Sequence, residues 1–74
     1  MDMRKLVGGN TRRLRVARGV TQERLSELSG LTQQYISGLE QGRRNPTILT
    51  LFELAQALKT TPAALITPSD DDDD

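Results

Sequence analysis

The stretch Thr21–Glu40, "TQERLSELSGLTQQYISGLE", has the spacing of two short helices joined by a tight turn. Thr21 can accept a hydrogen bond from a free N–H at the start of a first helix, Gln22 to about Ser29. Gly30 then supplies the residue with positive φ that a tight turn needs. A second threonine starts the helix Thr32–Gln41, so the spacing predicts a helix-turn-helix.

The positions that must pack between these two helices are all apolar or small. A bulky residue at Ser26 would hold the helices apart, and Leu28 is expected to point inward as well. The full set of predicted packing positions is Leu25, Ser26, Gly30, Leu31, Ile36 and Leu39.

The opposite side of the second helix is polar but uncharged. At 100° per residue, Gln33, Gln34, Ser37 and Gly38 lie opposite its buried side. A glutamine amide can bond to N6 and N7 of adenine in the major groove, and the N-terminal end of such a helix meets the base edges. We predict that these four residues contact bases. An ordinary solvated helix face is the alternative.

Hydrogen-bonding and basic residues flank this helix on several sides, and we predict that they contact DNA phosphates. Arginines bind phosphate regardless of sequence, and a helix N-terminus offers free N–H groups. Ordinary solubilising charge is the alternative for the arginines. The predicted phosphate contacts are Thr21, Gln22, Tyr35, Arg43, Arg44, Asn45, Arg12 and Arg13.

The remaining pattern is helical throughout, without a period of two. Three further helices are expected, at about Met3 to Arg18 behind the cap Asp2, after Thr47, and at Pro62–Ile66 behind Thr61. The predicted inward residues of the first are Met3, Val7, Thr11, Leu14 and Ala17, and those of the fourth are Ile48, Leu51, Leu54, Ala55 and Leu58. We predict an all-α, compact five-helix domain at 1–67 and a disordered acidic tail at 68–74.

Composition excludes most other functions. The chain has no cysteine and no histidine, and no Gly-rich phosphate loop, so we expect no enzyme, no metal and no cofactor. The formal net charge is zero, but five of the ten acidic residues form the run Asp70–Asp74, which leaves a basic body suited to a polyanion. That run is a solvated tail, a linker stump or an artificial addition; an autoinhibitory tail is the alternative.

From about Leu6 to Ile66 the chain resembles the lambda-repressor-like, Xre-type helix-turn-helix domains of phage and bacterial regulators. Three motifs carry the resemblance in order: "R-x-x-x-G-x-T-Q" from Arg15, "T-Q-Q-Y-I-S-x-L-E-x-G-x-R-x-P" from Thr32 and "T-L-x-x-L-A-x-A-L" from Thr50. Together they are far more specific than a helix-turn-helix match alone.

The resemblance implies five helices, the third of which lies in the major groove. It implies that Gln22 contacts a phosphate and supports Gln33, and that Arg15 and Glu40 form an ion pair between the first and third helices. It also implies a homodimer on a palindromic operator, formed through the C-terminal helices at Pro62–Ile66.

Two positions depart from the family pattern. Gly38 replaces a longer side chain on the groove face, so no target sequence can be transferred from a relative. Lys59 replaces the glycine that often follows the fourth helix.

We therefore predict a cytoplasmic, sequence-specific regulator of transcription that binds double-stranded DNA, and specifically a repressor. The longest apolar-rich run, "ILTLFELAQAL", is interrupted by polar residues, so no membrane segment is expected. Two alternatives remain open: a protein-interaction or antitoxin-like module with the same fold, and the DNA-binding head of a longer, ligand-sensing regulator.

Overall fold

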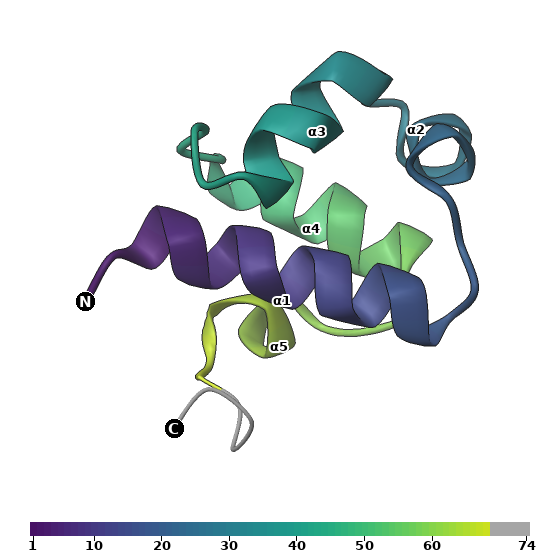
Figure 1. The fold of residues 1–74 in the computed structure, drawn as a ribbon. Helices are drawn as coiled ribbons and strands as arrows, with labels where there is room; N and C mark the ends of the chain where they lie inside the picture. Colours follow the sequence, from purple (N-terminus) through teal and green to yellow (C-terminus); the bar gives the residue numbers. More distant parts are fainter. Residues whose placement is uncertain (69–74) are drawn as a thin grey trace.

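The computed structural model describes residues 1–68, which form five α-helices and no strand. These are α1 (Met3–Ala17), α2 (Gln22–Ser29), α3 (Gln33–Glu40), α4 (Ile48–Ala57) and α5 (Pro62–Ile66). Helix α1 contacts α3 on one side and α5 on the other, while α2 and α5 both pack on α4 (Figure 1). The predicted all-α, five-helix architecture is confirmed. Residues 69–74 of the predicted tail lie outside the described part.

Each helix begins at the capping residue that the sequence predicts. The Asp2 carboxylate accepts a hydrogen bond from the Arg4 N–H at 3.1 Å. The four threonine caps accept one from the backbone N–H three residues further on, at 3.0–3.2 Å. Two helix ends lie one residue earlier than expected, because Arg18 and Gln41 are C-caps rather than helical residues.

One small apolar core joins all five helices. It consists of Val7, Leu25, Ile36, Leu39, Leu54, Ala55, Leu58 and Leu65. Three of the six predicted helix-turn-helix packing positions are part of it, since Leu25, Ile36 and Leu39 are fully buried. Ser26 and Leu31 are half-buried, and Gly30 in the turn is exposed. The Ser26 hydroxyl donates a hydrogen bond to the Leu31 carbonyl, which ties α2 to the chain beyond the turn.

Four residues that were predicted to point inward are exposed, so these predictions were wrong. Met3 and Ile48 stand in the first turn of their helices, where the side chain extends past the neighbouring elements, and are 46% and 86% exposed. Ala17 lies in the last turn of α1 and Leu28 on the edge of α2, where it borders a hollow between α2 and α4.

A buried asparagine that the sequence reasoning missed attaches α5 to α1. Asn10 is 1% exposed, and its amide donates to the carbonyls of Leu65 and Thr67 at 2.9 and 3.0 Å. These carbonyls stand at the end of α5, where no further helical turn can satisfy them. The only sequence signal is a polar residue on the side of α1 that carries Val7.

Gly8 allows a close approach of α1 to α3. It is buried in α1, and a Cβ atom at this position would overlap the carbonyl oxygen of Leu39 in α3. The sequence suggests only that a glycine here weakens the helix. In the structure the missing side chain lets two backbones touch.

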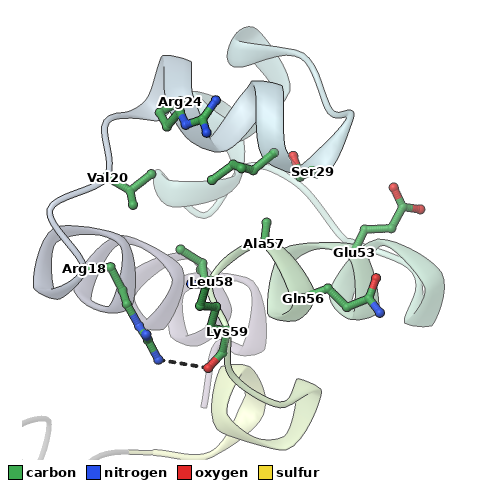
Figure 2. A pocket seen from close by; sticks show the side chains of 10 residues that line it. Arg18, Val20, Arg24, Ser29, Glu53, Gln56, Ala57, Leu58 and Lys59 are labelled. Atoms are coloured by element: carbon green, nitrogen blue, oxygen red, sulfur yellow. Dashed lines mark hydrogen bonds between the residues drawn. The ribbon is translucent and has the colours of Figure 1, made fainter.

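Lys59 takes the backbone conformation of the glycine that it replaces. Its φ is 55°, the only positive value among the non-glycine residues 1–68. The Arg18 guanidinium donates to the Lys59 carbonyl at 2.9 Å, as the dashed line in Figure 2 shows. This bond connects the end of α1 to the turn after α4 and helps to hold an otherwise unfavourable conformation.

No helix among residues 1–68 combines the length and the apolar content needed to cross a membrane.

Candidate nucleic-acid interface

The turn between α2 and α3 holds the third helix against the core while leaving its outer side open. Gly30 ends α2 at φ 80°, in the left-handed region that a residue with a side chain rarely adopts. On the core side of α3, Leu39 is fully buried. Gln33 and Gln34, the first two residues of α3, are exposed. The end of α3 that presents its amides is therefore its free N-terminal end.

One polar hollow gathers the predicted base contacts and some of the predicted phosphate contacts. Its lining residues are Gln22, Gln33, Gln34, Ser37, Gly38, Gln41, Arg43 and Arg44. We call the α3 residues Gln33, Gln34, Ser37 and Gly38, together with the cap Gln41, the reading face. The structure thus brings all four predicted base contacts together, with two arginines and Gln22 at the edge.

A hydrogen-bonded network behind the reading face connects three helices. The Arg15 guanidinium of α1 donates to both Glu40 carboxylate oxygens, from Nε at 2.7 Å and from Nη2 at 3.0 Å. It also donates to the Val20 carbonyl at 2.9 Å. The Gln22 amide of α2 donates to the same carboxylate at 3.1 Å. The ion pair that the resemblance implies is therefore present, and Gln22 donates a hydrogen bond to its carboxylate.

The two ion pairs among residues 1–68 differ strongly in burial. The side chains of Arg15 and Glu40 are 12% and 4% exposed, whereas those of Arg24 and Glu27 on α2 are 59% and 58% exposed. The hydrogen bond to Glu40 raises the pKa of the Arg15 guanidinium above its ordinary value. The Arg15–Glu40 pair is thus a fixed structural element, and the exposed pair is surface charge.

Arg44 lies across the outer surface of α3. Its guanidinium sits over the ring of Tyr35, 5.4 Å from the ring centroid. A Cβ atom on Gly38 would lie 3.2 Å from the Arg44 Nε. The side chain therefore occupies the space that the missing side chain of residue 38 leaves free.

The remaining predicted phosphate contacts lie outside this hollow. The Thr21 hydroxyl caps α2, and Asn45 lies beside Met3 at the start of α1. Arg12 borders a shallow hollow next to Glu40, while the Arg13 guanidinium donates to the side-chain amide oxygen (Oδ1) of Asn10 at 3.1 Å. A phosphate contact by any of these residues stays a prediction.

The outer side of α4 is apolar, which the sequence reasoning did not identify. Ile48, Leu49 and Phe52 are 86%, 65% and 46% exposed, and they lie within 100° of one another around the helix. We call these three residues the apolar face. Ile66 of α5 is also 44% exposed. The helical positions of Leu49 and Phe52 could have indicated the face, because they lie away from the core side of α4, whereas Ile48 is in phase with the core.

Comparison with known proteins agrees with this geometry. The sequence profile of the helix-turn-helix family matches residues 12–65. An uncharacterized HTH-type transcriptional regulator of Sinorhizobium fredii, y4dJ, is 59% identical over 71 residues, which is 96% of this chain and 92% of the relative. The control protein C.SmaI of Serratia marcescens is 40% identical over 67 residues, covering 90% and 80% of the two chains.

A solved structure agrees as well. The restriction-modification controller protein C.AhdI from Aeromonas hydrophila superposes with a TM-score of 0.81 at 40% identity, over 84% of this chain and 94% of that chain. The resemblance seen in the sequence motifs is confirmed by the matched residues, the identities and the shared fold. This chain therefore belongs to the helix-turn-helix family of DNA-binding transcriptional regulators.

Proposed function

We propose that this protein is a transcriptional repressor that recognises a palindromic operator by placing α3 in the major groove. The observation that carries the proposal is the reading face, which is uncharged. It has exposed amides at the free end of a helix, a half-buried hydroxyl further along, and arginines in the same hollow. Amides have both donors and acceptors, so they can distinguish base pairs, whereas charged side chains mainly find phosphates.

Each part of the reading face then has a distinct role. Gln33 and Gln34 contact the first base pairs of a half-site, and Ser37 contacts the next. Gln22 supports Gln33 from α2 and donates to a phosphate, although its amide is already bound to Glu40 through one N–H. An amide nitrogen carries two N–H groups, so one remains for the DNA.

Phosphate contacts hold the protein in register on the duplex. Arg43 and Gln22 line the same hollow as the reading face, and Gln22 follows the cap Thr21 at the N-terminus of α2. We propose that Arg43 and this N-terminal turn contact the DNA backbone. We propose the same role for Arg12, Arg13, Asn45 and the Tyr35 hydroxyl. These contacts supply affinity that falls as salt rises, and they add little sequence preference.

A second copy of this chain covers the apolar face. The apolar face is a solvent-exposed patch formed by Ile48, Leu49 and Phe52 on one side of α4. The solvent-facing side of a surface helix normally carries polar residues, so such a patch indicates a site of interaction. The predicted interface at Pro62–Ile66 is compatible with this, because α5 packs against α4 and exposes Ile66. Two copies would present two α3 helices to half-sites about 34 Å apart on one side of the DNA.

Repression follows from occupancy. A dimer that covers a promoter excludes the transcription machinery without any further contact, whereas activation needs a second surface that binds it. We propose that the protein acts in the cytoplasm, where bacterial DNA lies.

Selection of bound sites from random duplex DNA tests the proposal. We expect a recovered motif with two inverted half-sites, one per protomer. A motif without symmetry would refute the dimer, and the absence of any motif would refute sequence-specific binding. In that last case a protein-interaction module is the function to test next.

A further inference from the structure

We infer that Arg44 contacts a guanine base and not only a phosphate, and that Gly38 makes this possible. The inference rests on the proposed DNA-binding function and assigns a further specificity residue to the same site. Sequence reasoning treats Arg44 as a phosphate contact because it lies beyond α3, four residues after Glu40. Its position in the structure favours a different role.

The Arg44 side chain is solvent-exposed, but it runs back along the surface of α3. It passes so close to Gly38 that a Cβ there would stand 3.2 Å from Nε, 3.6 Å from Cγ and 3.9 Å from Cδ of the arginine. Three successive groups of the side chain thus follow the surface of the helix. Any longer residue at position 38 would have to share this space.

Tyr35 fixes the far end of the side chain. The guanidinium carbon lies 5.4 Å from the centroid of the half-buried Tyr35 ring, within the range of a cation–π contact. An arginine held against helix and ring loses less conformational freedom on binding than one in solvent. The contact therefore favours this orientation before DNA arrives.

The guanidinium remains available as a hydrogen-bond donor. Within residues 1–68 it makes no ion pair and no hydrogen bond, in contrast to Arg15, Arg18 and Arg24. It lines the same hollow as Gln33, Gln34 and Ser37. A planar guanidinium on the groove side of a recognition helix matches O6 and N7 of guanine, the most frequent specific arginine contact in the major groove.

The geometry also gives the position of this guanine within the half-site. Gln33 and Gln34 stand at the N-terminal end of α3, and Gly38 lies more than one helical turn further along. The guanine is thus expected beyond the base pairs that the two glutamines contact. Gly38 is not an empty position on the reading face, because Arg44 supplies the side chain that it lacks.

Site selection with three proteins tests the inference: the wild type, Arg44→Ala and the matched control Arg43→Ala. We expect a guanine in each wild-type half-site, preferred over other bases by about 5- to 150-fold. Arg44→Ala should lose this preference and keep those due to Gln33 and Gln34. Arg43→Ala should weaken binding to all duplexes and leave the motif unchanged.

A fourth protein, Gly38→Gln, tests whether the position of the Arg44 side chain matters and not only its charge. Glutamine forms helices better than glycine, so this variant should fold, and it retains Arg44. Its side chain would displace Arg44 from α3, so the guanine preference should be lost although the charge remains. Retention of the guanine in Arg44→Ala or in Gly38→Gln would overturn the inference and leave the proposed function intact. A wild-type protein that selects no motif would instead overturn both.

Discussion

The outer faces of α3 and α4 are exposed to the same solvent but carry opposite chemistry. Helix α3 presents amides and a hydroxyl, whereas α4 presents the apolar face formed by Ile48, Leu49 and Phe52. Both helices bury their other side in one core, through the fully buried Leu39 and Leu54. The partners proposed for the two faces differ accordingly: base edges for α3 and a second apolar surface for α4.

The two faces share one scaffold, and breaking that scaffold should impair both. Glu40→Ala removes the acceptor for three hydrogen bonds from Arg15 and Gln22 and leaves the Arg15 charge without its partner. We expect a loss of about 3–5 kcal/mol in the free energy of unfolding, measured by urea titration.

Glu27→Ala is the matched control, because its ion pair with Arg24 is solvent-exposed. It should cost about 0.5 kcal/mol or less. Equal losses for the two variants would show that the Arg15–Glu40 network does not hold the helices together.

The next largest loss of stability is expected from a substitution at the contact between α1 and α3. Gly8→Ala places a methyl group on the Leu39 carbonyl, so the two helices must separate, and we expect a loss of about 2–3 kcal/mol. Gly9→Ala meets no atom within 4 Å and should stabilise α1 by about 0.5–1 kcal/mol. Thermal unfolding of the two variants measures the difference. A change in Tm of the same sign for Gly8→Ala and Gly9→Ala would contradict the close approach of α1 to α3.

The faces themselves should be separable from each other by mutation. Leu49→Glu puts a charge on the apolar face at a residue that is 65% exposed, so the monomer should stay folded. It should weaken the dimer by about 2 kcal/mol, seen as a raised Kd in analytical ultracentrifugation. Gln34→Ala should leave the dimer Kd unchanged and reduce operator binding. A dimer that tolerates Leu49→Glu would place the interface elsewhere.

The smallest expected effect concerns the edge of the reading face. Arg43→Ala should lower the slope of log affinity against log salt by about 1, for specific and random DNA alike. Fluorescence anisotropy at several salt concentrations measures the slope. An unchanged slope would mean that Arg43 contacts no phosphate.

Much of the fold could be predicted from the sequence because its signals are local. Each threonine cap bonds to a backbone N–H only three residues away, so Thr21, Thr32, Thr47 and Thr61 mark their helices without knowledge of the rest of the chain. The position of Gly30 likewise follows from the spacing of the two helices that it joins.

Features that depend on distant neighbours could not be predicted. Gly8 is indistinguishable from Gly9 until α3 is known to lie against it, and Asn10 bonds to a carbonyl 55 residues away. The side chain of Ile48 is apolar and in phase with the core, but no element covers the first turn of α4.

The same distinction applies to the site. A helical projection places Gln33, Gln34 and Ser37 on one side of α3, because all three belong to one helix. It gives no position for Arg44, which follows the helix and returns along it after the turn at Gly42. Base recognition by the α3 residues and by Arg44 stays a prediction until it is measured on DNA.

We expect the uncharged face of α3 to distinguish base sequences, and the affinity of Gln33→Ala for two duplexes tests this most directly. One duplex carries the selected operator, and the other carries a scrambled sequence of equal length. Both are measured at the same salt concentration. We predict a loss of about 1–3 kcal/mol on the operator and almost none on the scrambled duplex. Equal losses on both duplexes would contradict the claim.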